Sequence, residues 1–151
     1  GSAPAASSAP EPSTSNLPKV ELSVGPEHVV KMLNSGVDGT MVFEPAVIKV
    51  SIGDTIHFKA TDLSHNSASM AGMIPSGADS WAGMLSQDIS VTLEKEGVYV
   101  YQCDPHVMMA MVGVIQVGNA VNIDEVKSVA ADQKSKFIMN TSRLEQYLSQ
   151  L

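Results

Sequence analysis

The chain from residue 19 onward is built of short segments in which apolar and polar residues alternate or β-branched residues run together. Alternation with a period of two is typical of a strand with one buried face. Seven such segments are bounded by Gly, Pro, Asn or Asp, and we expect strands at 19–24, 28–34, 41–51, 54–60, 88–95, 97–103 and 111–118. Six or seven short strands without long helices between them predict an antiparallel sandwich or barrel.

The C-terminal segment, about residues 122–150, changes to the period of a helix. Two apolar stripes recur at helical spacing: Ile123, Val126 and Val129, and then Phe137, Ile138, Leu144, Tyr147 and Leu148. Asn122 precedes the first stripe and is suited to an N-cap position. We therefore predict a mainly β protein with two C-terminal α-helices packed on the outside of the sandwich.

Residues 1–18 are mostly Ala, Pro and Ser and contain almost no large apolar side chain. Such a segment cannot bury enough surface to offset the entropy of ordering it. We predict a disordered linker at 1–18 and one folded domain at 19–151, with its core from about residue 27. Composition does not decide between a tether from a removed lipid anchor and a leftover of processing.

Candidate chemistry is concentrated in the loop "YQCDPHVMMAM", which holds the sole cysteine, Cys103, followed by His106 and Met111. The spacing Cys-x2-His-x4-Met allows one short loop to fold three donors around an ion. A second histidine, His65, lies in the long loop 61–84, and long loops inside compact domains are usually functional. A thiolate and two imidazoles in a plane, with a weak axial thioether, form a type 1 copper site. The sequence therefore predicts His65, Cys103, His106 and Met111 as copper ligands.

Other interpretations of these residues explain less. Each of them taken singly is more often a packing or surface residue than a ligand. Zinc is disfavoured because structural zinc sites use four Cys or His ligands. A Cys–His nucleophile pair leaves Met111 and His65 unused, so we do not expect an enzyme. Copper storage or delivery uses the same soft ligands and stays open as the alternative function. We interpret His28 and His57 as surface or packing residues.

Composition narrows the function further. The formal charge of −7 and the pI near 4.9 argue against binding to nucleic acid or to anionic membrane surfaces. No run approaches the roughly 18 apolar residues of a membrane span. A single cysteine cannot form an internal disulfide.

Several segments together resemble the pseudoazurins, small blue copper proteins of the cupredoxin superfamily. These are "MVFEPAVIKVSIGDTIHF", "DLSHN", "GMIPSGA" and "GVYVYQCDPHVMMAMVGVIQVG", followed by the two helices. The resemblance implies a cupredoxin-like, eight-stranded two-sheet Greek-key β-sandwich with a type 1 copper centre. By motif position, His65, Cys103 and His106 are the equatorial ligands and Met111 is the axial one. The N–H of Asn66 is expected to donate to the sulfur of Cys103.

The same resemblance implies a soluble, periplasmic one-electron carrier, which we expect to be a monomer. Its partners would be redox proteins such as a copper nitrite reductase of denitrification or a cytochrome c. They are expected to dock at an apolar patch around His106, built from Met41, Pro75, Pro105, Val107 and Met109. The linker 1–18 would allow a membrane tether.

Two departures from the family bear on the partner. The family chain starts near Glu27, so the residues before it are extra. Pseudoazurins ring the copper end with lysines, whereas the matching positions here are Ser35, Val37, Leu63 and Gln102. Asp104 also replaces an uncharged residue within the ligand loop. The identity of the partner therefore does not follow from the family.

Overall fold

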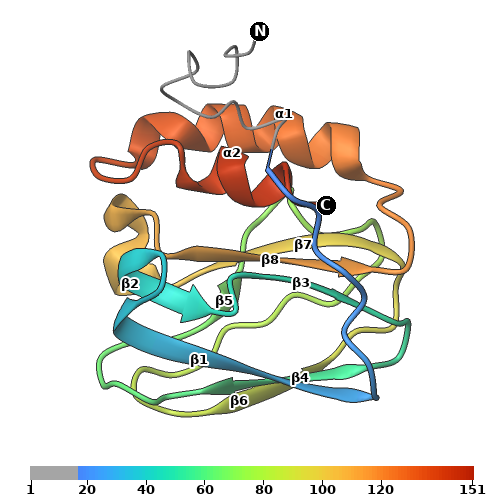
Figure 1. Cartoon of the computed structure of the whole chain (residues 1–151), viewed down its shortest axis with the longest axis horizontal. Helices are drawn as coiled ribbons and strands as arrows, with labels where there is room; N and C mark the ends of the chain where they lie inside the picture. The colour runs from blue at the N-terminus through green and yellow to red at the C-terminus, as the bar shows by residue number, and fades with distance from the viewer. Residues whose placement is uncertain (1–16) are drawn as a thin grey trace, which may run out of the picture.

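Two four-stranded sheets face each other, and helices cover the outer face of one of them (Figure 1). The computed structural model describes residues 17–151. The first sheet has the order β2 (Gly39–Glu44), β1 (Glu27–Gly36), β4 (Thr55–Lys59) and β6 (Ile89–Thr92). The second has the order β3 (Val47–Val50), β8 (Val112–Val117), β7 (Gly97–Gln102) and β5 (Ala68–Ser69). The predicted mainly β, two-sheet cupredoxin-like sandwich is confirmed.

The sheets are mixed, and here the expectation of purely antiparallel pairing was wrong. β1 pairs with β4 in parallel, and β3 pairs with β8 in parallel. Parallel neighbours need a crossover between them. The chain supplies it by leaving the first sheet after β2, forming β3 in the second sheet, and returning to form β4.

The observed strands differ in three places from those predicted by the periodicity. The predicted strand 41–51 is divided at Pro45, which has no N–H for a ladder and separates β2 from β3. Residues 19–24 form only an isolated bridge between Leu22 and Lys49, although their alternation predicted a strand. The short β5 lies within the long loop and spans two residues, too few to give a periodic signal.

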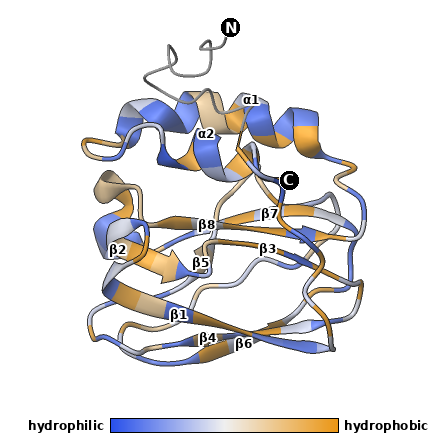
Figure 2. Ribbon diagram, viewed as in Figure 1, coloured by the Kyte–Doolittle hydropathy of each residue, from blue (hydrophilic) through white to orange (hydrophobic). Residues whose placement is uncertain are grey.

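Two apolar cores result from this arrangement. The interior core between the sheets contains an aromatic group in mutual contact: Phe43, Phe58, Trp81 and Tyr101. The helix core lies between the second sheet and the helices. Strands β3 and β8, which separate the two cores, are coloured largely as hydrophobic in Figure 2.

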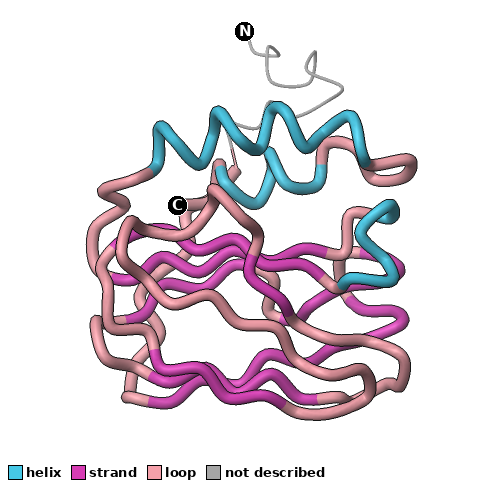
Figure 3. Tube along the Cα trace, turned by 180° about the vertical axis from the view of Figure 1, so that it is seen from behind, coloured by secondary structure: helices cyan, strands magenta, loops and turns pink. Residues whose placement is uncertain are grey.

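The two predicted C-terminal helices are confirmed as α1 (Ile123–Gln133) and α2 (Arg143–Leu148), with the short 3-10 helix η4 (Lys134–Lys136) between them. A second 3-10 helix, η3 (Asp104–Met109), lies at one end of the sandwich (Figure 3). Within residues 17–151, no helix has the length and apolar character needed to cross a membrane.

Candidate metal centre

The loop between β7 and β8 is closed by its own backbone hydrogen bonds. The last rung of the β7–β8 ladder pairs Gln102 with Val112, so Cys103 and Met111 form the next position of the hairpin. The N–H of Cys103 donates to the carbonyl of Met111 at 2.9 Å, and the N–H of Met111 donates to the carbonyl of His106 at 3.3 Å. The loop therefore brings the thiol, one imidazole and the thioether of the prediction to one end of the sandwich.

The long loop after β4 supplies the second imidazole. His65 is fully buried, and its Nε2 donates to Oδ1 of Asn34 at 2.7 Å. This bond leaves Nδ1 of His65 facing the other loop, 3.6 Å from Sγ of Cys103 and 3.2 Å from Nδ1 of His106. The distance from Sγ of Cys103 to Nδ1 of His106 is 3.3 Å. The structure thus brings together three of the four predicted donors.

The spacing of these three donors fits a metal ion in a trigonal plane. Nitrogen and thiolate sulfur bind such ions at roughly 2.0–2.3 Å, which puts donors of one plane roughly 3.5 Å apart. The separations of 3.2–3.6 Å agree with this value. All three donor atoms lie within 4.8 Å of one another. Met111 is fully buried in the same core as Cys103, where a thioether can serve as a weak axial donor.

Burial acts in opposite senses on the two kinds of donor: it favours the metal-binding form of His65 and disfavours that of Cys103 until a metal replaces the proton. Burial, together with the nearby His106, lowers the pKa of His65, so its imidazole is held in the neutral form that binds metal. Burial raises the pKa of the Cys103 thiol, and the charge of Asp104 adds to this effect. The backbone N–H groups of Asn66 and His106 oppose it by donating to the sulfur. The direction of this effect agrees with the predicted contact from the N–H of Asn66.

The Asn66 side chain also links the two loops, which sequence reasoning missed. Its Oδ1 accepts from the N–H of Asp104 at 2.7 Å, and its Nδ2 donates to Oδ2 of Asp104 at 2.9 Å. Asn34 was missed as well, because its contact with His65 depends on where β1 ends. The "SHN" motif was the available signal for Asn66, whereas nothing in the local sequence marked Asn34.

The other two histidines and Pro75 lie apart from the donors. His28 and His57 are paired with Asp54 and Glu27, each at 2.8 Å, as expected for packing or surface residues. The expectation that Pro75 borders His106 was wrong. Pro75 is buried against Gly97 at the start of β7, because the long loop runs back along that strand.

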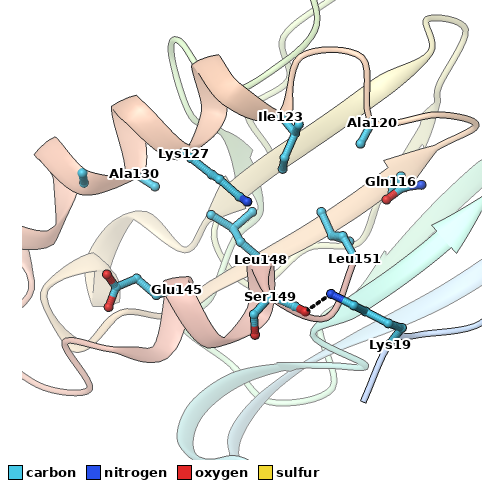
Figure 4. Close-up of a pocket in the computed structure, with 11 residues that line it drawn as sticks. Lys19, Gln116, Ala120, Ile123, Lys127, Ala130, Glu145, Leu148, Ser149 and Leu151 are labelled. Carbon is cyan, nitrogen blue, oxygen red and sulfur yellow. Dashed lines mark hydrogen bonds between the residues drawn. The ribbon is translucent and has the colours of Figure 1, made fainter. Parts of the chain in front are cut away.

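A cavity of about 570 Å³ lies away from the donors (Figure 4). It lies between α1, α2 and residue Lys19, whose Nζ donates to the carbonyl of Ser149 at 2.9 Å. None of the three clustered donors lines it. The cavity and the candidate metal centre are therefore separate features.

Comparisons with known proteins agree with the fold and the donor set. Residues 30–118 match the family model of copper binding proteins of the plastocyanin/azurin family. The chain is 46% identical over 104 residues to the pseudoazurin of Methylorubrum extorquens, covering 68% of this chain and 70% of that one. It is 39% identical over 110 residues to the pseudoazurin of Paracoccus pantotrophus, covering 72% and 76%.

Solved structures give the same result. The crystal structure of pseudoazurin from Methylobacterium extorquens AM1 aligns with a TM-score of 0.73 at 40% identity, over 82% of this chain and 98% of that one. Native pseudoazurin from Hyphomicrobium denitrificans aligns with a TM-score of 0.74 at 37% identity, over 83% and 98%.

Proposed function

Because the chain belongs to the pseudoazurins, within the plastocyanin/azurin family of copper-binding proteins, we propose that it carries single electrons between redox proteins, with a copper nitrite reductase or a cytochrome c among its partners. The observation that carries this proposal is the cluster of His65, Cys103 and His106. It joins one thiolate to two imidazoles at the end of the sandwich, where His106 is partly exposed.

The ligand set we propose is His65, Cys103 and His106 in the plane and Met111 on the axis. Copper bound there supplies one-electron redox chemistry between Cu(I) and Cu(II). The protein holds the donors in place through Asn34 on His65 and through the closed loop that carries the other three ligands. Donors that are fixed in this way need little rearrangement between oxidation states. The chain's residues perform no bond chemistry, so we propose a carrier and not an enzyme.

The partner is proposed to dock on apolar surface beside His106. Exposed apolar side chains flank the donor loops: Val37, Leu63, Met84, Leu85 and Met108. A backbone bond holds Met84 and Leu85 beside the donors, because the N–H of the next residue, Ser86, donates to the carbonyl of His65 at 2.9 Å. Contact through this surface would place the edge of His106 against the partner.

Steering by charge is proposed to be weak. Val37, Leu63 and Gln102 occupy positions where the family has lysines, and Lys59 is paired with Asp88 at 3.2 Å. Lys136 borders a shallow pocket with Val107 and Gln102 and supplies one positive charge near the loop. Exposed charges act over about one Debye length and are screened by salt. We therefore expect transfer rates that depend little on ionic strength.

We further propose that the protein works as a monomer in the periplasm, with residues 1–18 as a linker that would allow a membrane tether. The family resemblance and the composition of that segment support this location. Fractionation of cells expressing the natural protein would test it.

A copper titration with visible spectroscopy tests the function. We expect Cu(II) to give intense thiolate-to-copper bands at one equivalent, which bleach with a mild reductant and return on oxidation. A colourless protein that releases Cu(I) to a competing chelator within minutes would instead indicate storage or delivery.

Stopped-flow transfer to an acidic nitrite reductase across a salt series tests the docking surface. Rates nearly constant with salt are expected, and Leu63→Lys with Gln102→Lys should accelerate transfer at low salt only. A steep fall of the unmodified rate with added salt would contradict weak steering.

A further inference from the structure

Arg143, the first residue of α2, is buried with 6% of its surface exposed, yet its guanidinium faces backbone carbonyls and not a carboxylate. It forms no ion pair within the described part of the chain. Its Nη1 lies 3.2, 3.0, 3.4 and 3.3 Å from the carbonyl oxygens of Thr40, Met41, Met109 and Ala110, and its Nη2 lies 3.2 Å from that of Asp38.

These carbonyls come from two segments that meet at the same end of the sandwich, the β1–β2 hairpin and the ligand loop (Figure 1). Two of them belong to non-glycine residues in left-handed backbone conformation, Met41 with φ 54° and Ala110 with φ 58°. This conformation is unfavourable for such residues and persists where the surroundings hold it. Arg143 contacts the carbonyls of both, and one of these residues directly precedes Met111.

The segment before α2 adds further bonds to the same loop. The N–H groups of Ile138 and Met139 donate to the carbonyl of Met108 at 2.7 and 3.2 Å. Nδ2 of Asn140 donates to the carbonyl of Met109 at 3.1 Å. The C-terminal segment is thus attached to the ligand loop over three consecutive residues, 108–110.

We infer that Arg143 is a positioning residue for the copper centre. From its place on α2, it holds the ligand loop so that Met111 enters the site at a fixed position. The inference rests on the ligand set proposed above and concerns the centre and not the partner. An axial thioether is a weak ligand, so the protein scaffold decides its position more than the bond does. Met41, held by the same guanidinium, packs against the interior core that contains Cys103 and Met111.

Arginine suits this role for two reasons. Its planar fork offers five donors in fixed directions, which one Lys ammonium cannot match. Its permanent charge, which has no carboxylate at ion-pair distance within the described chain, favours the less positive Cu(I) state of a nearby copper ion.

The first test uses the apoprotein and needs no copper. In Arg143→Gln, amide hydrogen exchange at Ala110 and Met111 should become about tenfold faster, as expected for the loss of about one net hydrogen bond. Asn140→Gly should accelerate the same amides to a smaller extent, since glycine tolerates the φ of 54° and removes only the side-chain donor. Tyr147→Phe is the matched control, because Tyr147 lies on the same helix and its hydroxyl donates to Oδ2 of Asp38 at 3.2 Å, with no hydrogen bond from this hydroxyl to the ligand loop within the described residues.

The second test reads the loaded centre through its spectrum and potential. Arg143→Gln should lower the reduction potential and change the ratio of the two thiolate-to-copper bands. Arg143→Lys keeps the charge and loses the fork, so it should recover the potential more fully than the band ratio. Tyr147→Phe should change neither.

Exchange rates, band ratio and potential that all stay unchanged in folded Arg143→Gln would overturn the inference. If that variant does not fold, Arg143→Lys decides, and wild-type exchange at Ala110 and Met111 together with a wild-type band ratio in this variant would overturn the inference. Equal changes in Tyr147→Phe would mean that any disturbance of α2 alters the centre, and this result would also overturn the inference. An unmodified protein that binds no copper would contradict the proposed function but leave the exchange test in force.

Discussion

Four histidines form two contrasting pairs at opposite ends of the sandwich. His28 and His57 have both ring nitrogens bound to other side chains: His28 to Ser23 and Asp54, and His57 to Ser90 and Glu27. His65 uses only Nε2, on Asn34, and its Nδ1 faces the donor cluster. A histidine is therefore available to a metal when one nitrogen is fixed and the other is left free, and proximity to polar groups is no guide to this.

The partners of the two pairs differ in charge as well. The packing histidines each lie against a carboxylate, that of Asp54 or that of Glu27. His65 lies against a neutral amide, which orients the ring without favouring its protonation. The strand β1 contributes to both arrangements, with His28 near its start and Asn34 near its end.

The largest expected effect is the loss of colour in Cys103→Ser. The intense bands arise from the copper–thiolate bond, so a hydroxyl in its place should abolish them. His57→Gln, at the other pair, should keep the full spectrum. Visible absorption after Cu(II) addition measures both, and a blue Cys103→Ser protein would disprove the assignment of the thiolate ligand.

Asn34→Ala should weaken copper binding by about 10–100-fold, because it removes the group that orients a ligating imidazole. The backbone N–H of Asn34 keeps its bond to Asp62, so the strand end should stay in place. Ser23→Ala removes the corresponding bond to His28 and serves as the control. Competition with a copper chelator measures both affinities, and equal effects of the two changes would remove the distinction between the pairs.

Asp54→Ala should lower the free energy of unfolding by about 1–3 kcal/mol and leave the copper spectrum unchanged, since it strands the buried donors of His28 and Ser51. Burial alone would raise the pKa of Asp54, but the hydrogen bonds from His28 and Ser51 and the charge of His28 bring this pKa below 3.8. The stabilisation is therefore complete above about pH 4 and is lost as pH falls through the folded pKa. Denaturant unfolding of both proteins from pH 7 to 3 measures this. A gap between them that does not narrow as pH falls below 4 would contradict the assignment.

The smallest effect is expected from deleting residues 1–18, a segment of which 1–16 lie outside the described residues. The melting temperature and spectrum should stay nearly unchanged, because the composition offers no core residue or ligand. Deleting 1–25 should cost more, since Val20 and Ser23 donate backbone bonds of 2.8 Å to Gln150 and Lys49. Thermal unfolding of the two truncations compares them, and equal losses would mean that residues 19–25 add nothing.

The sequence was most informative where the chemistry is local. Cys103, His106 and Met111 share one loop, so their spacing alone predicted a common site. Asn34 and Arg143 act across the fold, and their roles depend on strand register and on the docking of α2, neither of which leaves a periodic signal. The division at Pro45 was readable, because proline cannot donate to a ladder. The parallel pairing of β1 with β4 and of β3 with β8 could not be read from the sequence, since alternation is the same in parallel and antiparallel strands with one buried face.

The complete burial of Cys103 also affects how readily its thiol is oxidised before the protein acquires copper. Thiols cross-link and oxidise as thiolates at accessible sites, and burial both hides this sulfur and keeps it protonated. An apoprotein under oxidising conditions is thereby protected from disulfide-linked dimers and from sulfenic acid formation. Of the three clustered donors only His106 is partly exposed, so in the proposed function the same ring would meet both the incoming copper ion and the redox partner.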